Sequence, residues 1–311
     1  MRGCSIFRRF HPHPVLLPSG EKELELKNES AGLTRKFQNR ENNVKEKEIK
    51  SIVKEGYARV AKENGSCCCG HLSSCCGSAS TTEISKKIGY SEKDLAGIPE
   101  GANLGLGCGN PLAMASLEKG ETVLDLGSGA GLDCFLASDL VGAGGRVIGV
   151  DMTPEMVQKA TDNAKRSGYK NVEFRLGEIE KLPVEDNSIN VIISNCVINL
   201  SPEKENVFKE ALRVLKPGGR ILVSDIVLLK ELPKAVKESA QGYVGCVSGA
   251  ILKEDYLRLI RNAGFIDVKV LEETSSGIEH MTDALHDAAG LIASVKISGV
   301  KPVNKNRCCG E

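Results

Sequence analysis

The 311-residue sequence has no excess of charge of either sign, because 41 lysines and arginines balance 41 aspartates and glutamates. Without a net positive charge the chain has no general electrostatic attraction to nucleic acid or to an acidic membrane, so neither is expected as a partner. No apolar run approaches the roughly 18 residues that a membrane-spanning helix needs. Residues 1–20 contain Arg8 and Arg9 but no continuous apolar core of a secretory signal. These absences predict a cytoplasmic protein.

Cysteine, by contrast, is plentiful, with 12 in the chain. Cytoplasmic cysteines are mostly kept reduced, so these thiols are expected to bind or react and not to form a disulfide framework. Five of them, together with His71, crowd into residues 67–76. The others are scattered, which makes the neighbourhood of each one informative.

A glycine-rich turn after a short apolar strand is the first functional motif. Residues 123–131 read Val-Leu-Asp-Leu-Gly-Ser-Gly-Ala-Gly and lead into an amphipathic segment, 132–140. Glycines permit a tight turn and let backbone N–H groups approach a bound ligand closely. A second strand, 146–150, ends in Asp151, about 20 residues after the loop, where a carboxylate can accept from both hydroxyls of a ribose. The pair of motifs predicts a nucleotide site.

Strands and helices alternate through the next part of the chain. Further strands are predicted at 171–176, 189–196 and 220–225, with helices at 155–167 and 207–215. The acidic loop 177–183 follows the third strand and could accept a hydrogen bond from an adenine amine. A domain that binds NAD is the less favoured alternative, because the turn reads Gly-Ser-Gly-Ala-Gly and lacks the GxGxxG spacing.

This order of motifs resembles the class I S-adenosylmethionine (SAM)-dependent methyltransferases over about residues 117–229. The resemblance implies an α/β fold with a doubly wound, Rossmann-like sheet of seven mostly parallel strands. It also implies a small helical and β cap after the fifth strand, with closing strands near 266–271 and 291–299. The expected SAM-binding residues are Asp125, Gly127, Ser128, Gly129, Gly131, Asp151, Met152, Glu178, Ile179 and Asn195.

The isolated cysteines differ in what surrounds them. Cys134 falls on a packing face of the helix after the glycine turn and is interpreted as core. Cys196 follows the fourth strand, at the carboxyl edge where such sheets bind ligands. Cys108 lies between Gly107 and Gly109 in a loop expected to fold over the cofactor, a poor place for a packing residue, and Cys246 lies in the helical cap predicted over 233–263.

The cysteine-bearing motifs closely resemble those of the arsenite SAM methyltransferases over about residues 46–302. The matching stretches are 106–111, 124–133, 150–156, 194–201 and 245–250. By that resemblance Cys108, Cys196 and Cys246 match the arsenic-binding thiols. A fourth family cysteine lies in the upstream cluster, where Cys67, Cys68, Cys69, Cys75 and Cys76 all remain candidates for a redox partner. The sequence departs from many relatives at Leu106, where an aromatic residue is expected, so no stacking contact is predicted there.

The resemblance implies a methyl transfer from SAM to trivalent arsenic, presented as arsenite or as a thiol adduct such as its glutathione complex. Arsenic takes three sulfurs and keeps a lone pair, which attacks the methyl group without needing a strong general base. The transfer oxidises arsenic, and a thiol reductant, glutathione or thioredoxin, is expected to reverse that oxidation. Repeated cycles would give further methylated products.

Five segments are predicted along the chain. A polar extension without regular structure covers 1–44. An amphipathic helix, the cysteine cluster and the Cys108 loop occupy 45–111. The SAM-binding core spans 112–230, an arsenic-binding cap with closing strands spans 231–303, and a tail with Cys308 and Cys309 covers 304–311.

Two alternatives remain at this point. Methyltransferases acting on a carbon or oxygen of a quinone-like or sterol-like acceptor share motifs 177–183 and 216–219, although such chemistry needs a base and an apolar pocket and has no use for three separated thiols. A thiol-rich metal- or metalloid-sequestering protein is the second. Zinc sites favour CxxC spacing, whereas the cluster cysteines here are contiguous. A zinc protein would carry stoichiometric metal as purified.

Overall fold

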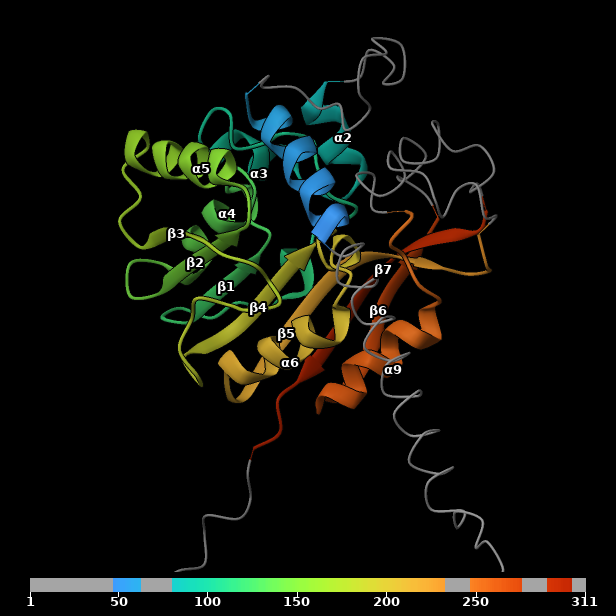
Figure 1. Ribbon diagram of the computed structural model, residues 1–311. Coiled ribbons are helices and arrows are strands. Elements are labelled where there is room, and N and C mark those ends of the chain that lie inside the picture. Colours follow the sequence, from blue (N-terminus) through green and yellow to red (C-terminus); the bar gives the residue numbers. More distant parts are fainter. Residues whose placement is uncertain (1–46, 63–79, 233–246, 276–289, 304–311) are drawn as a thin grey trace, which may run out of the picture. The chain divides into compact units, whose positions relative to one another are not determined.

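The computed structural model describes residues 47–62, 80–232, 247–275 and 290–303 (Figure 1). The chain divides into two compact units, 1–47 and 48–311, and the account below concerns the second. Cys246 and all the cysteines of the 67–76 cluster lie outside the described residues, as do Cys4, Cys308 and Cys309. Within the described part, no helix is long and apolar enough to cross a membrane.

The centre of this unit is a seven-stranded sheet in the order β3-β2-β1-β4-β5-β7-β6. The first five strands are parallel, whereas β7 is antiparallel to both β5 and β6. This confirms the predicted fold, including the two closing strands. The strands are β1 Thr122–Leu126, β2 Arg146–Asp151, β3 Val172–Leu176, β4 Ile189–Asn195, β5 Leu215–Leu228, β6 Ile266–Thr274 and β7 Ile292–Val300.

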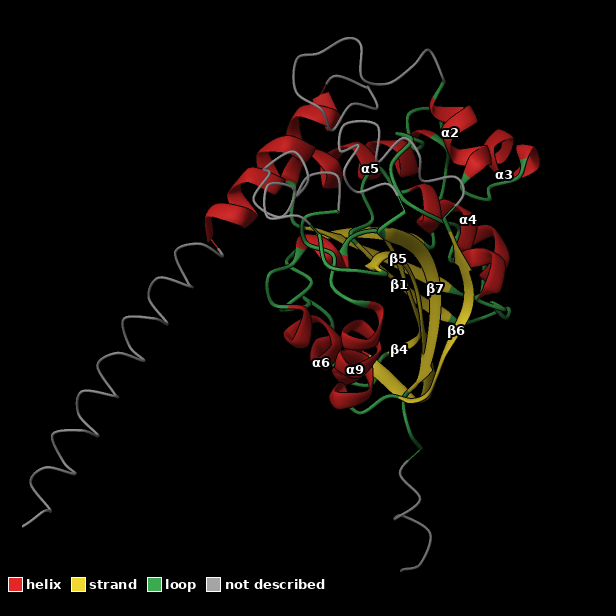
Figure 2. Cartoon of the chain, turned by 90° about the vertical axis from the view of Figure 1, so that its right-hand side faces the viewer, coloured by secondary structure: helices red, strands yellow, loops and turns green. Residues whose placement is uncertain are grey.

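Helices cover both faces of the sheet, as the side view shows (Figure 2). On one face α4 (Leu132–Val141) packs against β1 and β2, and α5 (Pro154–Arg166) lies over β2 and β3. On the other face α6 (Lys204–Val214) and α9 (Lys253–Ala263) pack against each other and against β5. The short helices α2 (Thr81–Lys87) and α3 (Glu92–Gly97) each begin at a serine with a complete capping box.

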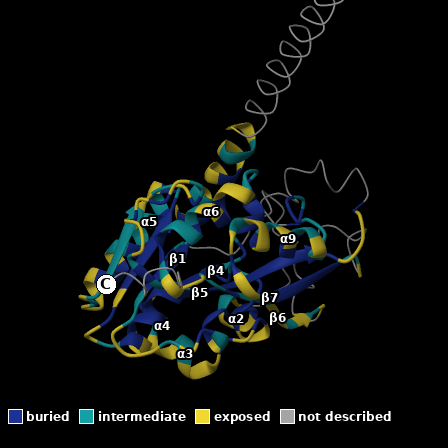
Figure 3. Cartoon of the chain, turned by 90° about the horizontal axis from the view of Figure 1, so that it is seen from below, coloured by how far each residue is buried: buried dark blue, intermediate teal, exposed yellow. Residues whose placement is uncertain are grey.

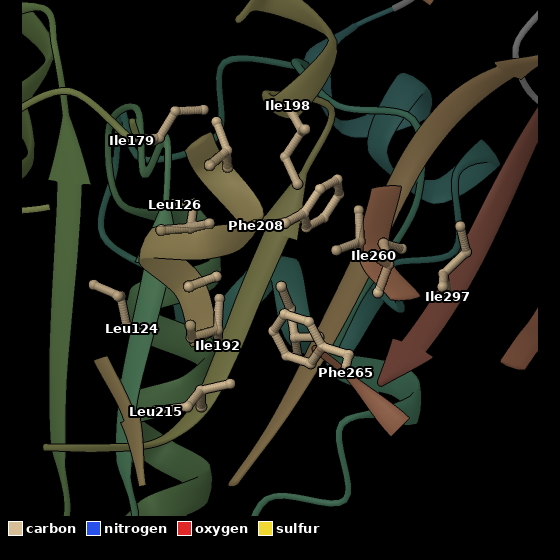
Figure 4. Close-up of a cluster of buried hydrophobic side chains, with 14 of the residues drawn as sticks. Leu124, Leu126, Ile179, Ile192, Ile198, Phe208, Leu215, Ile260, Phe265 and Ile297 are labelled. Atoms are coloured by element: carbon tan, nitrogen blue, oxygen red, sulfur yellow. The ribbon is translucent and has the colours of Figure 1, made fainter. Parts of the chain in front are cut away.

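Alternation along each parallel strand divides the apolar core in two. In β1, Leu124 and Leu126 join the cluster under α6 and α9, whereas Val123 joins the cluster under α4. Ile192 on β4 likewise faces Phe208 and the α9 side (Figure 4). Both faces of β1, β2 and β4 are therefore buried, which explains why their sequences are mostly apolar. Buried residues follow the strands through the middle of the unit (Figure 3).

The predicted amphipathic helix is present over residues 47–62 and lies across the carboxyl edge of the sheet (Figure 1). Val53 packs in the same cluster as Cys108 and Cys196, and Val60 packs with Ala130 of the glycine turn. The apolar face of this helix therefore covers both the cluster with Cys108 and Cys196 and the glycine turn, at the carboxyl edge of the sheet.

Two predicted elements differ from the structure. Strand β5 begins at Leu215, not at residue 220, because Leu215 already pairs with Ile189 of β4. The register then shifts, and pairing with β4 continues from Arg220. The sequence Pro217-Gly218-Gly219 predicts a helix stop followed by a loop, but an irregularity in the pairing with β4 accommodates it within the strand. Residues 247–252 form a turn and not a helix, so of the helix predicted over 233–263 the structure describes only α9.

Gly131 supports a stability prediction. Its φ is +99°, and a Cβ there would come 2.7 Å from Phe135 and 2.9 Å from Phe174. Gly131→Ala should lower the free energy of unfolding by about 2–4 kcal/mol, through left-handed strain plus overpacking. Gly120→Ala is the matched control, because its φ is +86° but a Cβ would meet nothing within 4 Å. It should cost only about 1–2 kcal/mol. Urea denaturation measures both, and equal losses would refute the packing contribution.

Candidate active site

The glycine turn is folded back onto the end of β2. The backbone N–H groups of Gly127 and Ser128 both donate to the carbonyl of Val150, at 2.8 and 3.1 Å. Gly127 and Gly129 have φ of +69° and +52°, a region that glycine adopts without strain. A Cβ on Gly127 would lie 2.4 Å from Val197, so the turn is also pressed against the chain that follows Cys196.

Three buried carboxylates surround this turn. Asp151 accepts from the N–H of Gly129 at 3.0 Å and from the N–H of Thr153 at 2.8 Å. Burial raises the pKa of Asp151 despite these bonds. Burial, together with the charge of Asp133, raises the pKa of Asp125 well above its usual value. The pKa of Asp133 is raised to about 6, again by burial. The edge therefore favours a cationic ligand, whose charge would offset this crowding.

The turn fits a nucleotide-type methyl donor. The hydroxyl of Ser128 is buried and has no hydrogen-bond partner in the part of the chain that the structure describes. Such an orphaned polar group is what a bound ligand would satisfy. Met152 directly follows β2 and packs in the cluster that contains Cys108 and Cys196. Ile179 is buried in the core on the α6 and α9 side.

Glu178 forms an ion pair with the helix over residues 47–62. Its carboxylate accepts from Lys50 Nζ at 2.9 Å, and Lys50 also lies 3.1 Å from Glu180. These pairs tie helix 47–62 to the acidic loop after β3. An adenine contact from Glu178 stays a prediction.

The loop that bears Cys108 is held by its backbone. The N–H of Cys108 donates to Asn195 Oδ1 at 3.1 Å, and its carbonyl accepts from the Ser294 hydroxyl at 2.7 Å. Asn195 Nδ2 in turn donates to the carbonyl of Gly109 at 2.7 Å. A Cβ on Gly109 would lie 2.0 Å from Ser224 Oγ, so only glycine allows this approach. The glycines beside Cys108 therefore serve close packing onto β4, β5 and β7.

Cys196 has a left-handed backbone conformation, with φ of +58°. This conformation is uncommon for a residue with a side chain and costs energy that the surroundings must supply. Its N–H donates to the carbonyl of Ser224 at 2.8 Å, which fixes the turn just past β4. The strain is consistent with a functional site, because it sets the direction of the thiol.

The structure brings Cys108 and Cys196 together with a third group that the sequence analysis missed, Asp225 on β5. One ligand atom from each, two Sγ atoms and a carboxylate oxygen, all lie within 4.8 Å of one another, and all three residues are buried. Asp225 Oδ1 accepts from Asn199 Nδ2 and from the N–H of Ile226, both at 2.9 Å. Burial raises its pKa to about 6.

Cys134 has the predicted core position, fully buried among residues of α4 and the sheet. Its Sγ also lies 3.2 Å from Asp125 Oδ2, as donor to the carboxylate. The role of Asn195 as a cofactor ligand stays a prediction, and its amide also donates to Tyr90 and Asp133. The signal for Asp225, the missed residue, was slight, because it is only the last residue of the predicted fifth strand.

The fold and this edge together define a class I SAM-dependent methyltransferase. Residues 117–264 match the family model described as "Methyltransferase domain". The chain is 46% identical over 264 residues to an arsenite methyltransferase of Halobacterium salinarum, covering 82% of this chain and 67% of the relative. The chain belongs to the arsenite methyltransferase family.

Two further comparisons agree with this assignment. An arsenite methyltransferase of Aquipseudomonas alcaligenes is 41% identical over 208 residues, with 63% of this chain and 60% of the relative covered. The crystal structure of an arsenic(III) SAM methyltransferase from Chlamydomonas reinhardtii superposes with a TM-score of 0.56 and 35% identity, covering 71% of this chain and 74% of that one. The chain thus spans about three-fifths to three-quarters of these relatives.

The amide of Asn195 supports a prediction about the reactivity of Cys108, which is only 3% exposed. Asn195→Ala removes the two bonds from Asn195 to the loop backbone, leaves the bond from Ser294, and should increase the rate of alkylation of Cys108 at least about 5-fold, an opening of about 1 kcal/mol. Peptide mass spectrometry after a timed iodoacetamide pulse measures it. Cys134 in the same sample is the internal control, and an equal increase there would mean general unfolding.

Proposed function

We propose that this chain transfers the methyl group of SAM to trivalent arsenic. The observation that carries the proposal is the meeting of the Cys108 and Cys196 thiols, far apart in sequence, at a carboxyl edge that also holds the glycine turn. Two buried thiols within 4.8 Å of each other are suited to a soft, thiophilic centre. The family membership supports the same substrate.

Cys246 is proposed as the third thiol. It lies outside the described residues, directly before Val247, which packs in the same cluster as Cys108 and Cys196. Three thiolates would take the three bonding positions of arsenic and leave its lone pair free. Burial excludes water, which would otherwise compete for the arsenic.

The glycine turn is proposed to hold SAM, which supplies the methyl group. Asp151 at the end of β2 would accept from the ribose hydroxyls, and the Ser128 hydroxyl would gain a partner. Backbone atoms of the turn and the thiols then fix the two reactants relative to each other. Orientation alone can account for several powers of ten in rate, and arsenic has no proton to lose.

A thiol reductant is proposed to complete each cycle. Methyl transfer leaves arsenic formally pentavalent, and two electrons return it to the trivalent state. A pair of protein thiols can donate them by forming a disulfide, with Cys108 and one of the 67–76 cysteines as the proposed pair. Glutathione or thioredoxin would then reduce that disulfide. Because this chemistry needs a reducing pool, the cytoplasm is the proposed location.

The segment boundaries stay proposals as well. We propose that 45–111 is an N-terminal segment with the amphipathic helix, the cysteine cluster and the Cys108 loop, that 112–230 is the SAM-binding core, and that 231–303 is the arsenic-binding cap with the closing strands. The terminal segments 1–44 and 304–311 are proposed to lie outside the catalytic part.

Speciation of arsenic tests the activity directly. Purified protein is incubated with SAM, arsenite and glutathione, and the products are separated and quantified as arsenic. Methylated arsenicals that require all three additions are expected. Stoichiometric zinc in the purified protein, with no methylated arsenic, would instead support a metal-sequestering role.

Replacing either proposed arsenic ligand tests the thiol site. Cys196→Ser and Cys246→Ser each put a hard oxygen in place of a soft sulfur, so both should abolish methylation of arsenite and of monomethylarsenite. Cys4→Ser, outside the catalytic segments, is the matched control and should keep full turnover. Wild-type turnover by Cys246→Ser would show that the three-thiol site is wrong.

Asp151→Ala tests the cofactor side separately. Charge-assisted hydrogen bonds to buried hydroxyls are typically worth about 1.5–3 kcal/mol, so SAM affinity should fall about 10-fold or more. Arsenite affinity should be nearly unchanged, because the thiols lie on other elements. Equilibrium dialysis of each ligand alone decides the matter, and unchanged SAM binding would mean that β2 is misassigned as the ribose strand.

A further inference from the structure

A single buried carboxylate lies against the pair of thiols. Asp225 is fully buried on β5, and its carboxylate is within 4.8 Å of both Cys108 Sγ and Cys196 Sγ. Nothing in a thiol site for arsenic requires such a group, because three sulfurs already complete the coordination. Burying a carboxylate is costly, so its presence calls for a chemical reason.

Hydrogen bonds fix the carboxyl group of Asp225 in place. Besides Asn199 and the N–H of Ile226, the hydroxyl of Tyr256 donates to Oδ2 at 2.9 Å. The positive charge of Lys204 also favours the ionised form, and these contacts limit the rise in pKa that burial causes, to about 6. The three hydrogen bonds leave the carboxyl group little freedom to move. A fixed charge of this kind needs no reorganisation during a reaction.

The transfer moves a positive charge across the site. The bond between the methyl carbon and the SAM sulfur breaks, and its electron pair stays on sulfur, which becomes a neutral thioether. The arsenic lone pair forms the new bond to the methyl carbon. Arsenic held by three thiolates is neutral before the step and carries the positive charge after it, at the pentavalent level. Charge and electrons balance within the two reactants.

We propose that the Asp225 carboxylate stabilises the positive charge that develops on arsenic during methyl transfer. The inference rests on the proposed function. It names a residue that acts on the substrate through its field and that is neither a thiol nor a SAM ligand.

The position of Asp225 in the sheet makes this stabilisation selective. The sheet order places β4 between β1 and β5, so Asp225 is two strands from β1. With neighbouring strands about 4.8 Å apart, that is roughly 10 Å from the strand that carries the glycine turn. The thiols, by contrast, adjoin the carboxylate. Its field therefore favours charge on arsenic more than charge on the donor sulfur, as transition-state stabilisation requires.

The opposite side of the edge carries the competing charges. Asp125, Asp133 and Asp151 are all buried beside the glycine turn, where they favour the cationic donor before transfer. Without a carboxylate on the arsenic side, the positive charge would move from an environment that stabilises it to one without a stabilising charge. Asp225 offsets that difference.

The decisive variant is Asp225→Asn, which keeps the shape and removes the charge. With enzyme in excess over arsenite at pH 8, the single-turnover rate of methylation should fall at least about 10-fold, equivalent to about 1.4 kcal/mol. The affinities for arsenite and for SAM, measured separately by equilibrium dialysis, should stay within about threefold. Asp186→Asn is the matched control on the exposed surface, where Asp186 pairs with Arg213, and it should leave the rate unchanged.

The outcomes separate the inference from the function on which it rests. If wild-type protein forms no methylated arsenic, the proposed function itself fails. If it does and Asp225→Asn keeps its rate, the charge has no such role. A parallel loss of arsenite affinity would show that Asp225 only positions the thiols, which also overturns the inference.

A second variant covers the case in which Asp225→Asn does not fold. Tyr256→Phe removes one hydrogen bond to the same carboxylate but keeps its charge. Its single-turnover rate should therefore fall by less than about threefold. A 10-fold fall with unchanged thermal stability would mean that the hydrogen-bond network, and not the charge, matters.

Discussion

The side-chain amide of Asn195 is the interaction on which the site depends. Its oxygen accepts from the N–H of Cys108, and its nitrogen donates to Gly109, Tyr90 and Asp133. Asn195 is the last residue of β4, so a rigid strand end fixes a loop from far upstream in the chain. Cys196 follows directly. One residue thus sets the distance between the two thiols and links both to the acidic surroundings of the glycine turn.

Buried acidic groups lie at two separate places along this edge of the sheet. Buried carboxylates gather beside the glycine turn, whereas the thiol side has Asp225 with Tyr256, whose pKa is raised well above its usual value by burial and by Asp225. A buried charge is tolerated only where an opposite charge or hydrogen bonds stabilise it. Beside the glycine turn a cationic ligand would stabilise the carboxylates. On the thiol side, hydrogen bonds and Lys204 stabilise Asp225 before any ligand binds. The protein is therefore prepared for positive charge at two neighbouring points.

Much of the fold could be predicted, because the central parallel strands β1, β2 and β4 are buried on both faces and read as apolar runs that end at turns. The glycine turn and Asp151 could be predicted because each lies at the end of such an apolar strand. The irregularity in β5 was missed because Pro217 and Gly218 signal a break locally, whereas pairing with β4 and β7 overrides that signal. Asp225 was missed because its partners come from three other elements, and no local pattern reports such convergence.

Helix 47–62 connects the two halves of the edge. Val53 packs with the thiol cluster and Val60 with the glycine turn, while Lys50 bonds Glu178 and Glu180 beyond β3. These apolar contacts and ion pairs are all lost together if the helix moves away as a body. Access to the thiols and access to the glycine turn are therefore controlled by the same element. A reaction that must exclude water while two dissimilar ligands meet gains from this shared cover, since burying one ligand also encloses the other.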